Sequence, residues 1–193
     1  MLTNSLTPTA TGILERFEQV RSRTESLCAQ LEVEDFVVQS MPDASPVKWH
    51  LAHTSWFFET FILEPHGYGA GLSTPDFRDL FNSYYKSIGN AFSRPHRGVL
   101  SRPTVREIYE YRARVNEAMS ALVKEGRLDP VGCERLLLGL HHEEQHQELL
   151  LTDIKHALSF HPNPPAIAPM AAVNPSPEST GWVGFDGGLV NVG

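Results

Sequence analysis

The sequence contains few cysteines and no long apolar run. Its two cysteines, Cys28 and Cys133, are too few and too far apart to form the disulfide framework of a small secreted domain. Residues 1–11 lack the cationic and apolar segments of a secretory signal. No stretch approaches the roughly 20 apolar residues that a helix needs to cross a bilayer. These absences predict a reduced, cytoplasmic protein with no membrane partner.

Basic residues are also sparse. The 16 lysines and arginines are outnumbered by 23 aspartates and glutamates, which gives a net charge of −7. Because the basic residues are scattered, with no basic stripe, we expect no nucleic-acid partner. The 193 residues, of which 41% are hydrophobic, are enough for one core of ordinary size. Nine histidines are more than packing alone requires.

Apolar residues recur at helical spacing in four long segments, and no strand-like alternation precedes residue 180. A shorter pattern from Asp76 to Ile88 predicts a helix that buries Phe77, Leu80, Phe81, Tyr84 and Tyr85. We expect an all-α, up-and-down four-helix bundle, whose long helices cover about residues 9–31, 46–63, 104–124 and 130–158.

Two histidines lie one helical turn apart in the middle of the longest expected helix. At about 100° per residue, His142 and His146 project only about 40° apart, on a stripe shared with Leu149 and Asp153. Two imidazoles at this spacing can bind one metal ion with little strain. The leucine-rich segments on either side favour a metal site over a plain polar patch, because polar rings between apolar blocks need a partner.

A third histidine lies in an aromatic stripe of the second expected helix. One face of that helix carries, at helical spacing, Trp49, His53, Trp56, Phe57 and Thr60. A lone histidine there is more often a hydrogen-bonded core residue, but bundles bring inward-facing groups together. We therefore predict a metal site of His53, His142 and His146, with His50 ranked second and open positions typical of a catalytic centre. The spacing does not choose between iron, zinc and nickel.

The same segment also fits the H-E-x-x-H pattern of zinc proteases, in which the glutamate, here Glu143, is the general base. Such a site needs a third ligand further along the chain, and Thr152 occupies the position at which one subclass has histidine. Glu178, which follows much later, lies in a proline-rich stretch. Because the pattern fixes only three positions, chance matches are common and the protease is the weaker interpretation.

The segment from Gly89 to Pro103 has no regular period and contains Arg94, His96, Arg97 and Arg102. One interpretation is a solvated loop. The other is a cationic rim that receives a substrate carboxylate through paired hydrogen bonds. The residues alone favour the solvated loop.

The character of the sequence changes after the expected bundle of residues 9–161. Residues 162–180 contain six prolines and have the composition of an extended linker. Residues 181–193 alternate aromatic or β-branched residues with glycine, like the first hairpin of a β-rich module. We therefore expect the chain to lack most of a second domain.

Five segments resemble the DinB-like N-terminal domain of the ergothioneine-biosynthesis sulfoxide synthases (the EgtB family). The resemblance covers about residues 10–160, and the segments that carry it are VQSMPDASP (38–46), KWHLAHTSWFFET (48–60), FNSYY (81–85), RGVLSRPT (97–104) and HEEQHQEL (142–149). The tail from Gly181 resembles the opening of the family's second domain, which is related to formylglycine-generating enzymes (sulfatase-modifying factors).

The resemblance implies a non-haem iron oxidoreductase that uses O₂ to join a cysteine-type thiol, cysteine or γ-glutamylcysteine, to hercynine and gives a sulfoxide. Carried over residue by residue, it implies that His53, His142 and His146 bind Fe(II). The family's catalytic tyrosine belongs to the second domain. We therefore expect no catalytic residue in this chain and little or no sulfoxide formation by it alone.

The resemblance also implies substrate-binding residues. Gln145 would face the bound imidazole of hercynine. Arg94 and Arg97 match an Arg-x-x-Arg pair that holds the carboxylate of the thiol substrate, which reverses the preference for a solvated loop.

Other functions share these features. A DinB-like thiol transferase that uses zinc or nickel has the same bundle and three histidines. A helical interaction domain needs no metal at all. Relatives that act on histidine, or that use a selenium donor, match the same residues.

Overall fold

Four long helices dominate the part of the chain that the structure describes. The computed structural model describes residues 10–83, 88–167 and 181–190. The long helices are α1 (Ala10–Leu27), α2 (Val47–Phe58), α4 (Val105–Lys124) and α5 (Pro130–Leu158). The shorter elements are η1 (Val33–Val37), η2 (Glu59–Leu63), α3 (Phe77–Leu80) and η3 (Arg94–Val99). The all-α prediction is confirmed, since the described residues contain no strand.

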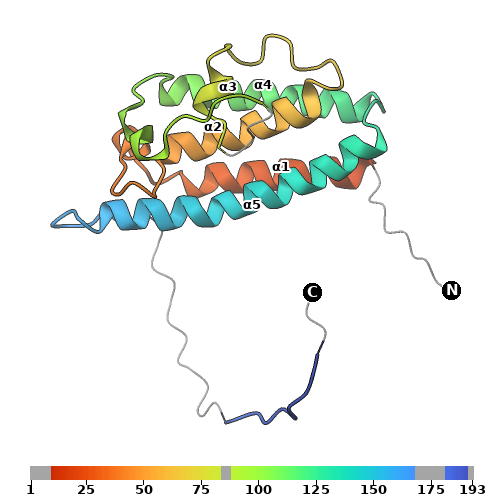
Figure 1. The fold of residues 1–193 in the computed structure, drawn as a ribbon. Coiled ribbons are helices and arrows are strands. Elements are labelled where there is room, and N and C mark those ends of the chain that lie inside the picture. Colours follow the sequence, from red (N-terminus) through yellow and green to blue (C-terminus); the bar gives the residue numbers. More distant parts are fainter. Residues whose placement is uncertain (1–9, 84–87, 168–180, 191–193) are drawn as a thin grey trace.

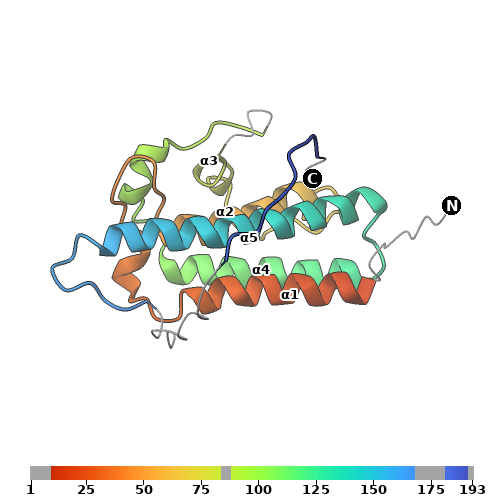
Figure 2. The ribbon, with the colours of Figure 1, turned by 90° about the horizontal axis from the view of Figure 1, so that it is seen from below.

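The long helices form a bundle in which α1 and α2 each contact both α4 and α5. α1 and α5 run in one direction, and α2 and α4 run in the other (Figures 1 and 2). The expected up-and-down order is therefore wrong at α4. The long connection of residues 64–104 returns the chain to the end of the bundle at which α2 begins. There, Lys48 Nζ of α2 donates to the carbonyl oxygens of Leu100 and Pro103, just before α4.

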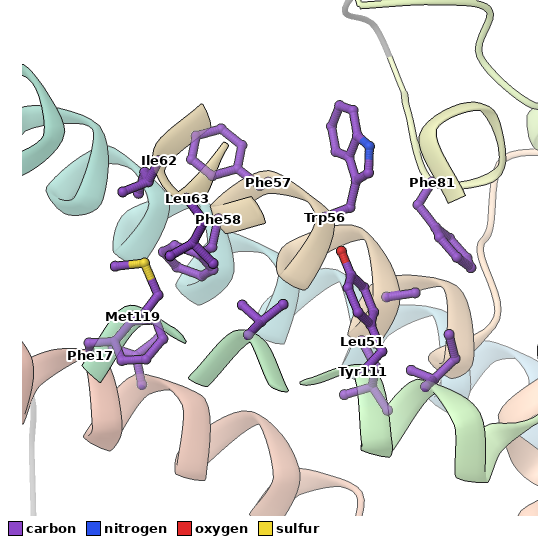
Figure 3. Close-up of a cluster of buried hydrophobic side chains, with 14 of the residues drawn as sticks. Phe17, Leu51, Trp56, Phe57, Phe58, Ile62, Leu63, Phe81, Tyr111 and Met119 are labelled. Atoms are coloured by element: carbon purple, nitrogen blue, oxygen red, sulfur yellow. The ribbon is translucent and has the colours of Figure 1, made fainter. Parts of the chain in front are cut away.

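α2 is the central helix of the bundle, and all 12 of its residues are buried. Its Phe58 packs edge-on against Phe17 of α1, with 5.1 Å between ring centroids. Met119 and Tyr111 of α4 belong to the same buried cluster (Figure 3). A helix that is buried on every side must satisfy its polar side chains through partners on other elements.

A buried ion network centred on Glu143 joins the four long helices. The Glu143 carboxylate accepts hydrogen bonds from Arg21 at 2.9 Å, Arg112 at 3.1 Å and Thr24 at 2.7 Å. Arg21 also donates to Ser55 of α2 at 2.8 Å. Burial raises the pKa of Glu143, but the charges of Arg21 and Arg112 outweigh burial and lower this pKa to about 2. Glu143 is therefore a carboxylate held between two guanidinium groups.

The short aromatic helix expected over Asp76 to Ile88 is a single turn, α3. The fully buried Asn82 side chain, just after it, donates to a backbone carbonyl seven residues ahead. Side-chain bonds of this kind compete with helix formation. The predicted burial is confirmed for Phe77 and Phe81, whereas Leu80 is only partly buried. Two members of the expected helix lie outside the described residues, namely Tyr84 and Tyr85.

The C-terminal segment forms no strand within its described part, residues 181–190, and every one of these residues is exposed. A strand needs a neighbour for its backbone hydrogen bonds, and no described segment pairs with this one. Residues 168–180 of the expected linker and residues 191–193 lie outside the described part. The second domain stays a prediction. Among the described helices, none is both long and apolar enough to cross a bilayer.

We expect Glu143→Gln to lower the free energy of unfolding by about 3–5 kcal/mol, because glutamine removes the buried charge that Arg21 and Arg112 share. Arg112 keeps the partly exposed Glu25 at 3.4 Å, whereas Arg21 retains no ion pair with a described residue. Glu144→Gln is the matched control, since the half-exposed Glu144 lies 3.6 Å from Arg16 and such surface pairs contribute less than about 1 kcal/mol. Urea unfolding of both variants measures the difference. Equal, small losses in the two variants would contradict the structural role of Glu143.

Candidate metal centre

α2 and α5 run antiparallel and bring three imidazoles together. His53 comes from α2, and His142 and His146 come from successive turns of α5. One ligand nitrogen from each ring lies within 4.8 Å of the other two. The ε nitrogens of His53 and His142 are 3.2 Å apart, and the ring centroids of His53 and His146 are 4.7 Å apart. The three histidines singled out in the sequence thus form one cluster.

The donor set fits a divalent transition metal. Two imidazole nitrogens bound about 2.1 Å from one ion, in tetrahedral or octahedral geometry, lie about 3.0–3.4 Å apart. The separation of 3.2 Å between His53 Nε2 and His142 Nε2 falls in that range. The three rings could therefore hold one metal ion without a change of fold.

The three rings are also neutral. Burial lowers the pKa of His142 to about 4. Burial and repulsion from neighbouring rings lower the pKa values of His53 and His146 well below their ordinary range. Neutral imidazole is the form that binds a metal, so the fold keeps these side chains ready to bind near pH 7.

The backbone carbonyl of Phe81 orients His53. His53 Nδ1 lies 2.6 Å from this oxygen. Because a carbonyl oxygen only accepts, the proton of the ring is on Nδ1 and the Nε2 lone pair faces the cluster. Outer contacts of this kind fix the ring orientation of metal-binding histidines. The sequence does not reveal this role, because it belongs to a backbone atom whose position depends on where α3 ends.

His50 lies beside the cluster and contacts one of its members. Its Nδ1 is 2.8 Å from His146 Nδ1, and its Nε2 is 3.1 Å from Asp153 Oδ2. Both His50 and Asp153 are buried. The sequence places Asp153 on the stripe of His146. Their contact through His50 depends on how α2 crosses α5, which periodicity alone does not give.

A cavity of about 430 Å³ adjoins the imidazoles, within the roughly 300–1,000 Å³ typical of small-molecule sites. Its lining includes the three histidines and the other three site residues that the sequence suggested, Gln145, Arg94 and Arg97. The other two basic residues of that loop lie elsewhere, since His96 is exposed and Arg102 lines a different cavity.

The two arginines of the cavity come from η3 and are held differently. The Arg97 guanidinium lies 3.4 Å from the centroid of the Trp49 ring and donates to Ser45 Oγ at 2.8 Å. Arg94 is half-buried, and among the described residues no acceptor lies within hydrogen-bonding distance of its Nε. No carboxylate occurs among the described lining residues. This wall is therefore suited to an anionic group such as a carboxylate.

The geometry excludes the protease interpretation. The Glu143 carboxylate binds Arg21 and Arg112 in the buried network and does not line the cavity of the imidazoles. A general base must come within hydrogen-bonding distance of the water that it activates. Thr152, at the position where one protease subclass has its third ligand, is exposed and donates to its own helix.

Comparison with known protein families finds a matching family model. A family model described as DinB superfamily matches residues 16–150. The matched range is more than half of the chain and contains every lining residue of the cavity named above. A comparison with curated proteins gives no significant match.

The metal-free chain is expected to lose stability as the pH falls from about 6.5 towards 4. Unfolded histidines take up protons near pH 6.5, whereas folded His142 stays neutral down to about pH 4. The unfolded state then binds more protons, so each such histidine destabilises the fold by up to about 1.4 kcal/mol per pH unit. Urea unfolding between about pH 5 and 8 checks this window. A pH-independent stability there would contradict neutral imidazoles in the fold.

Proposed function

The chain belongs to the DinB superfamily, and we propose that it is the iron-binding helical domain of a non-haem Fe(II), O₂-dependent sulfoxide synthase. This enzyme would join a cysteine-type thiol to hercynine in ergothioneine biosynthesis. The observation that carries the proposal is one cavity that combines three neutral imidazoles with two arginines. All five segments on which the sequence resemblance rests, residues 38–46, 48–60, 81–85, 97–104 and 142–149, contribute to the lining of that cavity.

His53, His142 and His146 would hold the ion. When bound, Fe(II) would supply the activation of O₂ and would favour the thiolate form of the substrate. The other residues of the cavity bind and orient the substrates. Holding reactants in a fixed geometry removes much of the entropic cost of bringing them together.

Arg94 and Arg97 would bind the carboxylate of the thiol substrate. Arg97 is already held by Trp49 and Ser45, so little side-chain freedom is lost when a ligand binds it. The Nε of Arg94 has a hydrogen to donate and no acceptor among the described residues. A cysteine bound to these arginines by its carboxylate would share one cavity with the three imidazoles.

Gln145 would contact the imidazole of hercynine. It lies next to His146 in the sequence and lines the same cavity. Its amide can both donate and accept hydrogen bonds, which matches a neutral imidazole with one donor and one acceptor. On this proposal the bundle binds the metal ion and the thiol and contributes one contact to hercynine.

The first test is metal binding by the anaerobically purified chain. We expect one Fe(II) per chain. His142→Ala should weaken iron binding by more than about 100-fold, since even the loss of a residue that only hydrogen-bonds a metal ligand typically lowers metal affinity about 10–100-fold. His141→Ala is the matched control, because His141 is exposed and contacts Glu144. Chelator competition measures both affinities. Unchanged iron binding by His142→Ala would contradict the site, and stoichiometric zinc without iron uptake would favour the thiol transferase.

The second test distinguishes the contribution of the substrate's carboxylate to binding from that of its thiol. Cysteine titrated into the Fe(II)–nitrosyl protein should bind Arg94→Ala about 10-fold more weakly than wild type, because a charge-assisted hydrogen bond is lost. Cysteamine, which lacks the carboxylate, should bind both proteins equally. Arg102→Ala is the control, since Arg102 lines another cavity. Equal losses for cysteine and cysteamine would contradict the carboxylate contact.

A further inference from the structure

A chain of hydrogen bonds leads from the backbone just before α2 to one of the three imidazoles. The backbone N–H of Ser45 donates to Asp153 Oδ2 at 2.8 Å. The same oxygen lies 3.1 Å from His50 Nε2, and His50 Nδ1 lies 2.8 Å from His146 Nδ1. Ser45, His50 and Asp153 are each 8% exposed or less, which keeps bulk water out of these contacts.

The first link of this chain fixes the direction of the others. A backbone N–H only donates, so Asp153 Oδ2 is an acceptor, and His50 Nε2 beside it must carry a proton. His50 is buried, and its other ring nitrogen faces a second imidazole rather than an anion, so nothing there compensates the cost of burying a second proton and its charge. The His50 ring therefore has one proton, and its Nδ1 is an acceptor. The proton between the two rings then belongs to His146 Nδ1.

We propose that His50 and Asp153 are positioning residues that keep the proton of His146 on Nδ1 and thereby present its Nε2 lone pair to the metal ion. This inference rests on the proposed metal site of three histidines, and it does not depend on the identity of the metal or the substrate. Without these partners the His146 ring can carry its proton on either nitrogen. The form with a proton on Nε2 cannot bind a metal through that atom.

The Nδ1 atoms of the other two imidazoles have different surroundings from that of His146. His53 reaches the same state directly, because the Phe81 carbonyl accepts the proton of its Nδ1. His142 Nδ1 is buried, and no described residue offers it a hydrogen-bond partner. Two of the three rings thus have their protonated nitrogen fixed by the backbone. One is fixed by a carbonyl, and the other by an amide that acts through two side chains.

Two substitutions of Asp153 separate this role from simple packing. In Asp153→Asn, the Ser45 N–H still needs an acceptor, so the amide oxygen of the asparagine takes the place of Asp153 Oδ2. His50 Nε2 then still donates to that oxygen, and the proton of His146 stays on Nδ1. In Asp153→Leu, the proton of His50 Nε2 has no acceptor and the direction of the chain is lost. With Co(II) as the probe, we expect an affinity within about 3-fold of wild type for the asparagine variant and about 10–100-fold weaker for the leucine variant.

A second measurement reports the proton position without any metal. Two-bond ¹H–¹⁵N correlation spectra of the metal-free full chain identify which ring nitrogen of His146 is protonated. We expect Nδ1 in the wild type and in Asp153→Asn, and a mixture of both forms in Asp153→Leu. A proton on Nε2 in the wild type, or wild-type Co(II) affinity in Asp153→Leu, would overturn the role of the two residues alone. Failure of Co(II) to bind the wild-type chain would instead overturn the metal site itself.

Discussion

The complete burial of α2 is the constraint on which the rest of the structure depends. Each polar side chain of this helix must find a partner inside the protein, because an unpaired buried polar group is destabilising by several kcal/mol. Arg21 of α1 binds Ser55, and Arg112 of α4 binds Thr54 and the carbonyl of Leu51. On the other side of α2 the partners of the buried histidines come from α5 and from the loop after α3.

α5 serves two buried polar clusters at once. Adjacent residues of a helix point about 100° apart, so Glu143 enters the ion network while His142 faces α2. Two arginines balance the charge of Glu143. The imidazole cluster, in contrast, contains neutral donors, and the Asp153 carboxylate is linked to it through His50. Protons and a metal ion compete for the same lone pairs, and burial disfavours the protons, so the cluster favours a metal near pH 7.

The sequence predicts much of this structure, and the limits have physical causes. Apolar periodicity predicted the 130–158 helix to its observed ends, and the spacing of His142 and His146 predicted two members of the cluster. Periodicity carries no information on where a long connection returns, so the direction of α4 was missed. The composition of the 89–103 loop favoured a solvated segment, yet Arg97 is buried against Trp49. That contact joins distant parts of the chain, which composition does not reveal, and the family resemblance had implied only that Arg97 binds substrate.

The central claim is that three imidazoles from two helices bind one metal ion in this bundle. X-ray absorption at the metal edge of the iron-loaded chain tests it most directly, because bound imidazole rings give characteristic multiple scattering. We expect three imidazole nitrogens at about 2.0–2.2 Å, and two in a chain that carries His53→Ala. A spectrum with one imidazole or none in the unaltered chain, or with no change on substitution of His53, would contradict it.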